Sequence, residues 1–249
     1  MPIRRLLLVA CLGLLPVFLS GGARAEPPKL KVAVLEDSPP LGYRDADGNL
    51  TGFSYALAQA VCVELNAQCE FEVTKLDYLV EDLAAGHFDL AAVGLLNTPE
   101  RRQKILFTQP VYRSVTMWFA KPGVHPGQAG VRVSVFKGSA QERYAQAQGW
   151  SIFPTQTDLQ MVEQLVAGVA HVAMVPLMTS LNLHKNRKFL QLGLQSTVLQ
   201  VPELIGNACF GINPRRGELK GPVDEALEKI KRNGTYDRIN SVFLPFRVM

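Results

Sequence analysis

The chain has 249 residues, of which 47% are hydrophobic and 19% are charged, a balance typical of a globular protein with one or two domains. Its formal net charge of +4 comes mostly from residues 1–25, which carry three arginines and no acidic residue. The rest of the chain is nearly neutral and has no long block of like charge, so nothing in it indicates nucleic-acid binding.

The first 25 residues predict a signal peptide. Arg4 and Arg5 precede the apolar run LLLVACLGLLPVFLS, and the small residues of GGARA supply a cleavage site after Ala25. There are two alternatives to a cleaved signal peptide. An uncleaved membrane anchor would have to use a short run that Pro16 interrupts, and a lipoprotein would use Cys11, because LVAC resembles a lipobox. We therefore expect the mature chain in the periplasm.

The first half of the mature chain alternates between predicted strands and helices. Buried strands are expected at residues 30–36, 69–73 and 88–96. Apolar residues recur at helical spacing in two intervening segments, at Leu57, Val61 and Leu65, and at Leu76, Leu79, Val80 and Leu83. Asp47-Gly48 predicts a tight turn, and Gly86 stands where a helix end favours glycine. This alternation is typical of an α/β sheet.

A second α/β unit is expected after Lys121-Pro122-Gly123. Strands are predicted at residues 131–136 and 171–175, and helices at 139–148 and after the capping box that Thr157 and Gln160 form. The tail contains CFGIN and an amphipathic helix with Val223, Leu227 and Ile230, and we expect it to return to the first unit. Two such units place a cleft between them, where ligands bind beyond the carboxyl ends of the strands.

The mature chain has three cysteines. In an oxidising compartment Cys62 and Cys69 could pair, between the end of a predicted helix and the start of a strand, which leaves Cys209 as a buried thiol. The spacing lacks the further Cys or His ligands of a zinc site. The chain also contains no G-x-G-x-x-G, no P-loop and no C-x-x-C-H motif, so neither a metal nor a cofactor is expected.

Five segments together resemble the periplasmic solute-binding proteins for polar amino acids, the receptors of ABC importers. They are SPPLGYRDADGNLTGF, LDYLVEDLAAGHFDLAAVGL, NTPERRQKILFTQPVY, VFKGSAQERY and KIKRNGTYDRINSVF. The resemblance implies a two-lobed α/β fold in which two strands join the lobes and a hinge closes them on the ligand. Lobe 1 would comprise residues 26–113 and 205–249, and lobe 2 residues 114–204. The spacing of Cys62 and Cys69 is similar to that of a disulfide in the histidine and lysine/arginine/ornithine binders.

Arg101 is the residue on which the functional prediction depends. The resemblance implies that the arginine of the T-x-x-R segment, here Arg101, forms a bidentate pair with the carboxylate of the ligand. The local sequence agrees, because Thr98 is a suitable helix N-cap and Pro99 a suitable first helical residue. The alternative is a solvated helix arginine, which is our interpretation of Arg102.

Other positions of the implied pocket depart from the family pattern. Counting from Gly168, the acid that usually binds the ammonium group of the ligand is replaced by Pro176, and the usual lid aromatic aligns with Ser38. A hydroxyl residue often found before the family threonine is Leu96. The implied pocket residues are Ser38, Leu76, Gly94, Leu96, Thr98, Arg101, Phe136, Ser139, Ala140, Gln141 and Pro176.

This pocket has one strong cation and no evident partner for an ammonium group, which would be costly to bury unpaired. A carboxylate with an apolar or neutral polar body therefore suits these residues. Amino acids stay possible if Glu36, Asp37 or Asp77 supplies the missing acid. We thus predict a non-enzymatic, monomeric receptor that delivers an amino acid or an organic acid to an inner-membrane ABC permease.

Two other functions are considered. A cyclohexadienyl dehydratase has a similar fold and a carboxylate-binding arginine, but it needs a general acid in the cleft, and Pro176 occupies the most favourable place for one. A non-transport accessory protein that acts beside a periplasmic quinoprotein dehydrogenase would fit the loss of the ammonium site.

Overall fold

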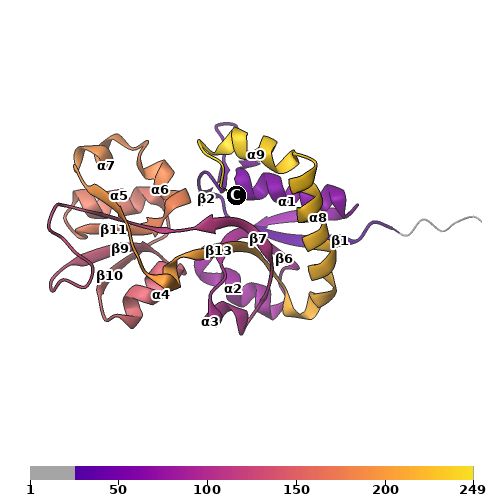
Figure 1. Ribbon diagram of the computed structural model, residues 1–249, viewed down its shortest axis with the longest axis horizontal. Coiled ribbons are helices and arrows are strands. Elements are labelled where there is room, and N and C mark those ends of the chain that lie inside the picture. The colour runs from indigo at the N-terminus through magenta and orange to yellow at the C-terminus, as the bar shows by residue number, and fades with distance from the viewer. Residues whose placement is uncertain (1–25, 249) are drawn as a thin grey trace, which may run out of the picture.

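The computed structural model describes residues 26–248, so the predicted signal peptide lies outside the described residues. Two five-stranded sheets, each with helices on both faces, form the two lobes of an α/β fold (Figure 1). In the described part of the chain, no helix is both long and apolar enough to cross a membrane.

Lobe 1 is built on a sheet with the strand order β5-β1-β6-β13-β7. Its strands are β1 (Lys29–Val34), β5 (Gln68–Val73), β6 (Leu90–Leu96), β7 (Leu106–Ser114) and β13 (Gly206–Ile212). β1 runs parallel to β5 and β6, whereas β13 is antiparallel to β6 and β7. One face is covered by α1 (Phe53–Glu64), α8 (Lys220–Arg232) and α9 (Thr235–Phe243), and the other by α2 (Leu76–Ala85) (Figure 1). Burial on both faces explains why β6 is apolar throughout.

Lobe 2 has the strand order β10-β9-β11-β8-β12. Its strands are β8 (Thr116–Ala120), β9 (Arg132–Phe136), β10 (Ser151–Thr155), β11 (Val172–Pro176) and β12 (Gln195–Val198). Helix α4 (Ala140–Ala147) packs on one face, and α5 (Asp158–Val166), α6 (Leu177–Leu183) and α7 (Arg187–Gln191) pack on the other. The side chains of β9 alternate accordingly, since Val133 and Val135 join the α4 core while the Ser134 hydroxyl bonds Gln164 of α5.

The chain crosses between the sheets twice, from Ser114 of β7 to Thr116 of β8, and from Val198 of β12 to Gly206 of β13. The second crossover includes the short 3₁₀ helix η1 (Pro202–Leu204), and another, η2 (Pro214–Leu219), precedes α8. We propose the lobe division 26–113 with 205–249, and 114–204, which these crossovers support. A three-stranded sheet of β2 (Asp37–Ser38), β3 (Gly42–Arg44) and β4 (Leu50–Thr51) adjoins lobe 1.

The local signals of the sequence are found in the structure. Ser139 and Thr157 cap α4 and α5 through their hydroxyl oxygens, and Gly86 ends α2 with a φ of 91°. The turn before β4 contains Gly48 at a φ of 83°, as Asp47-Gly48 predicted. The strands β7, β8, β10 and β12 and the helices α6, α7 and α9 had no separate prediction.

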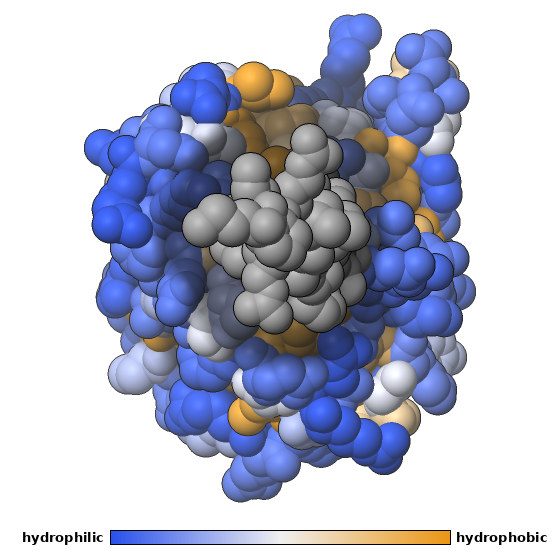
Figure 2. All heavy atoms as spheres, turned by 90° about the vertical axis from the view of Figure 1, so that its right-hand side faces the viewer, coloured by the Kyte–Doolittle hydropathy of each residue, from blue (hydrophilic) through white to orange (hydrophobic). Residues whose placement is uncertain are grey.

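Cys62 at the end of α1 forms a disulfide with Cys69 of β5, whereas Cys209 is a buried free thiol. The pairing implied by the resemblance is therefore present. The end of the molecule formed by lobe 1 is largely hydrophilic where it is visible, with only scattered apolar patches (Figure 2). This is the surface expected of a globular domain whose apolar residues are mostly in its cores.

Candidate functional site

Two neighbouring cavities lie between the lobes. The first, which we name the arginine cavity, has a volume of about 70 Å³ and contains Arg101 in its wall. The second, the adjacent cavity, measures about 230 Å³ and does not include Arg101. Both cavities share six wall residues, none of which is charged: Leu35, Ser38, Leu76, Ser139, Pro176 and Thr179.

Most of the predicted pocket residues lie together in this region. The arginine cavity is lined by nine of them, namely Ser38, Leu76, Gly94, Leu96, Arg101, Ser139, Ala140, Gln141 and Pro176. Phe136 lines the adjacent cavity. Thr98 lines neither cavity, and its contact in the structure is the cap of the short helix that carries Arg101.

Several wall residues were missed by the sequence reasoning. The arginine cavity also contains Leu35, Leu41, Val93, Leu95, Tyr112, Ser114 and Thr179. Thr179 had a usable signal, because it follows Pro176 by three residues on a helix that begins at a strand end. Tyr112 had no such signal. It is buried, and its hydroxyl donates to the Gly94 carbonyl over 3.3 Å. Burial strongly raises the pKa of Tyr112.

The backbone around Thr98 places Arg101 in the wall. β6 ends at Leu96, and α3 (Pro99–Arg102) begins directly after Thr98, whose hydroxyl oxygen accepts from the Arg101 amide over 3.3 Å. Pro99 occupies the first helical position, as predicted. Arg102 on the same short helix is exposed and donates to Asn97, whereas only 3% of the Arg101 surface is exposed. The solvated alternative therefore applies to Arg102 and not to Arg101.

The Arg101 guanidinium is a buried cation with few partners. One terminal nitrogen donates to the Leu96 carbonyl over 3.1 Å, and the other crosses between the lobes to the Gly138 carbonyl over 3.0 Å. Its Nε is buried and has no partner, and no ion pair with a carboxylate involves Arg101 among residues 26–248. Burial, with a contribution from Arg143, lowers the pKa of Arg101 to about 10. An anion beside this guanidinium would accept a hydrogen bond from Nε and would balance the buried positive charge.

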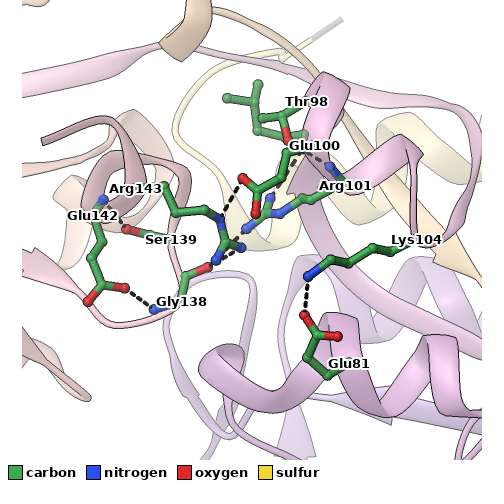
Figure 3. A network of polar contacts seen from close by, with 10 residues as sticks. Glu81, Thr98, Glu100, Arg101, Lys104, Gly138, Ser139, Glu142 and Arg143 are labelled. Atoms are coloured by element: carbon green, nitrogen blue, oxygen red, sulfur yellow. Dashed lines mark hydrogen bonds and ion pairs between the residues drawn. The ribbon is translucent and has the colours of Figure 1, made fainter. Parts of the chain in front are cut away.

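Further contacts join the lobes around Arg101 (Figure 3). Glu100 of lobe 1 pairs with Arg143 of lobe 2 over 3.2 Å, and Arg143 also donates to the Gly138 carbonyl. At the start of α2, Asp77 pairs with Lys137 over 3.1 Å and accepts from Gln156 over 3.3 Å. Burial would raise the pKa of Asp77, but the bonds from Lys137 and Gln156 hold it below its ordinary value. These contacts hold the two lobes together beside the cavities.

The turn that carries Gly138 meets lobe 1 at very short range. The backbone amide of Gly138 donates to the Glu142 carboxylate over 2.6 Å, while the Ser139 hydroxyl oxygen accepts from the Glu142 amide (Figure 3). These bonds hold Gly138 at a φ of +77°, in the left-handed region. A Cβ there would lie 2.4 Å from the Cα of Asp77, so only glycine permits this approach.

A chain of hydrogen bonds connects the cavity wall to both crossovers. The Gln141 side-chain amide donates to the Thr116 hydroxyl over 2.8 Å, and Thr116, the first residue of β8, donates to the Leu204 carbonyl over 3.1 Å. Because the only hydroxyl proton of Thr116 points to a carbonyl, the Gln141 group at Thr116 has to be the NH₂ donor. The orientation of Gln141 is therefore fixed by the hinge segments.

The three acids considered as ammonium partners have different surroundings. Asp77 is paired with Lys137, and Glu36 is paired with Arg44 over 2.5 Å. Glu36 and Asp37 line the adjacent cavity, and Asp37 is exposed with no ion pair among the described residues. In residues 26–248, no group of three or more His, Cys, Asp or Glu side chains is arranged to hold a metal ion.

Asp158, at the start of α5, predicts a pH dependence of stability. It is the first residue of α5; its Oδ2 accepts from Asn182 over 2.6 Å, and its Oδ1 is buried without a partner. Burial raises the pKa of Asp158 to about 6 from 3.8, although the Asn182 bond opposes the rise. The unfolded chain therefore releases this proton first, and stability is lost as the pH rises from about 4 to 6, by about 3 kcal/mol at most.

We expect Asp158→Asn to be more stable than the unchanged protein at pH 7 by about 1–3 kcal/mol, since no buried charge forms. The gain should disappear below pH 4, where both proteins carry a neutral group. Urea denaturation at a series of pH values measures this, with Glu225→Gln on the exposed side of α8 as the matched control. An equal pH dependence in Asp158→Asn and the unchanged protein contradicts the prediction.

Comparisons with known proteins identify the family of this chain. Residues 30–245 match the sequence model of the bacterial extracellular solute-binding proteins, family 3. ABC transporter arginine-binding protein 1 of Escherichia coli is 26% identical over 243 residues, which cover 93% of this chain and 96% of the relative. The histidine-binding periplasmic protein of Salmonella typhimurium is 26% identical and covers 90% of each chain.

Solved structures show the same two-lobed fold. A Salmonella typhimurium periplasmic binding protein with high arginine specificity superimposes with a TM-score of 0.74 at 22% identity, covering 87% of this chain and 99% of that chain. An ancestral amino-acid-binding protein, described as a precursor of cyclohexadienyl dehydratase, gives 0.73 at 24% identity over 87% and 95%. At these identities the likeness concerns the fold alone.

Proposed function

Because the chain belongs to the bacterial extracellular solute-binding proteins of family 3, we propose that it is the periplasmic receptor of an ABC importer. It binds a small carboxylate-bearing solute, an amino acid or an organic acid, between its two lobes through Arg101. It delivers this solute as a monomer to an inner-membrane permease and is not an enzyme.

The observation that supports this proposal is the state of Arg101. A fully buried guanidinium without a carboxylate partner is costly, and proteins retain such a group where a ligand completes it. Two of its five N–H donors are used by carbonyls, which leaves three for an anion. The remaining donors include Nε, so the planar fork can still bind both oxygens of one carboxylate.

The two alternative functions have less support. A dehydratase needs a positioned general acid, and no Asp, Glu or His lines the arginine cavity in the described chain. An accessory protein that has lost ligand binding would have no need for a buried cation beside a cavity. The curated relatives are transport proteins named for arginine and histidine, which favours a receptor.

A thermal-shift screen of ligand-stripped protein tests the proposal with amino acids and simple organic acids. A ligand present at one hundred times its dissociation constant stabilises the protein by about 2.7 kcal/mol. We expect Arg101→Met to remove this shift, because the carboxylate loses its charge partner. Arg102→Met, one residue further along α3 and exposed, should keep it.

Two results count against the proposal. One is a stabilising acid whose shift persists undiminished in Arg101→Met, because that ligand binds elsewhere. The other is the absence of any shift across the whole set of amino acids and organic acids. Circular dichroism of both variants checks that the loss of a shift does not come from a loss of folding.

A further inference from the structure

We propose that the preferred ligand is a carboxylic acid whose α-carbon carries a neutral group, a hydroxyl or oxo group, in place of an ammonium group. This inference rests on the proposed function, since it assumes that the ligand carboxylate is bound by Arg101. It narrows the ligand class from amino or organic acids to 2-hydroxy and 2-oxo acids.

The wall of the arginine cavity carries a single charge. Arg101 is the one charged residue in its wall within the described chain. The six residues at the junction with the adjacent cavity are all uncharged as well. A ligand that enters this space therefore meets a single cation and otherwise neutral groups.

Three acids in the contacts around Arg101 have other partners. Glu100 pairs with Arg143, and the Oδ2 of Asp77 pairs with Lys137, while the Oδ1 of Asp77 is buried without a partner in the described chain. The Glu142 carboxylate accepts from the Gly138 amide over 2.6 Å. None of these three lines either cavity, so none adds a carboxylate to the walls.

The covalent geometry of an amino acid decides where its ammonium group would lie. The α-nitrogen is about 2.5 Å from the carboxyl carbon, so a carboxylate on Arg101 holds it in the arginine cavity or at the uncharged junction. Glu36 and Asp37 line the adjacent cavity and can serve only a group further along the ligand. The α-ammonium would thus be buried beside a guanidinium without an opposite charge from the protein, at a cost in affinity.

A hydroxyl or oxo group suits the same place. The wall offers the hydroxyls of Ser38, Ser139 and Thr179, each of which can donate or accept a hydrogen bond. The Gln141 amide adds a further neutral polar group, whose NH₂ is held by Thr116. These groups satisfy a neutral α-substituent completely, because no charge has to be balanced.

The size and character of the two cavities limit the rest of the ligand. At about 70 Å³ the arginine cavity holds little more than the carboxylate and its α-carbon. The body then extends into the adjacent cavity of about 230 Å³, whose wall combines the apolar side chains of Val73, Leu76 and Phe136 with the charged residues Glu36, Asp37, Lys75 and Lys137. Both cavities together are near the lower limit of about 300 Å³ for small-molecule sites, which favours a short acid.

Isothermal titration calorimetry at pH 7 with isosteric pairs tests this inference. The pairs are lactate with alanine, 2-hydroxyisocaproate with leucine, and phenyllactate with phenylalanine, and arginine and histidine are added as single ligands. We expect at least one hydroxy acid to bind, with its paired amino acid at least tenfold weaker, and with the binding heat abolished in Arg101→Met.

The inference is overturned if any of the five amino acids binds as tightly as the best hydroxy acid, or if no hydroxy acid binds. The proposed function survives the first of these results as long as the amino acid depends on Arg101. It is lost only if all eight compounds fail, or if binding persists in Arg101→Met. The two failures are therefore distinguishable in one set of titrations.

Discussion

Gly138→Ala is expected to hold the two lobes apart. The added Cβ would lie 2.4 Å from the Cα and 2.6 Å from the amide nitrogen of Asp77, and 2.7 Å from the carbonyl carbon of Leu76. These are backbone atoms at the start of α2, so no side-chain rotation relieves the overlap. The lobes must therefore separate. This separation breaks the hydrogen bond from Arg101 to Gly138 and the ion pair of Asp77 with Lys137.

Small-angle X-ray scattering measures this opening as a larger radius of gyration than that of the unchanged protein. Any ligand held by both lobes should bind at least tenfold more weakly, because the part of the wall that lobe 2 supplies has moved away. Gly130→Ala is the matched control. Gly130 has the same φ of +77° but nothing within 4 Å of an added Cβ, so it bears the same backbone strain of about 1–2 kcal/mol without the overlap. Identical scattering from both variants would falsify the prediction.

Arg101→Met is expected to stabilise the unliganded protein, by about 1–3 kcal/mol, while it removes ligand binding. A buried cation without a carboxylate partner costs desolvation energy, and methionine fills a similar length of the wall without charge. The substitution leaves no carbonyl unpaired. The Leu96 oxygen still accepts from the Thr98 amide over 2.9 Å, and the Gly138 oxygen still accepts from Arg143 over 3.2 Å.

Urea denaturation at pH 7 measures the gain. Arg102→Met should stay within about 0.5 kcal/mol of the unchanged protein, since Arg102 is exposed. Arg101→Lys provides a second comparison, because it keeps a buried charge and loses the fork, so it should show no gain. If Arg101→Met is clearly less stable than the unchanged protein, the guanidinium contributes more through its two carbonyl bonds than its burial costs. In that case Arg101 does not lower the stability of the unliganded protein, and the prediction is wrong.

The sequence predicted those parts of the fold that local patterns determine. The apolar run of β6 and the caps at Thr98 and Thr157 are local, and each has its mechanism within a few residues. β7 could not be predicted in this way, because Pro110 lies inside it and proline argues against a paired strand. The structure accommodates Pro110 opposite Cys209, where the register between β7 and β13 shifts.

The candidate site was predicted where it follows strand ends and was missed where it depends on the docking of the lobes. Gly94, Leu96, Ser139 and Pro176 lie at such ends, and all four line the arginine cavity. The pairing of Asp77 with Lys137 joins residues 60 positions apart on different lobes, and no periodicity encodes it. The family resemblance singled out Arg101, and the structure adds that it is buried and lacks an acidic partner among residues 26–248.

The hydrogen bonds from Gln141 through Thr116 to Leu204 have a consequence for how this solute-binding protein can diverge. Gln141 lines the cavity and is also hydrogen-bonded to a crossover between the lobes. A substitution there cannot change the ligand preference without also changing that contact. Each replacement at position 141 also removes or changes the hydrogen bond to Thr116 at the first crossover. Ligand selectivity and the connection between the lobes therefore change together at position 141.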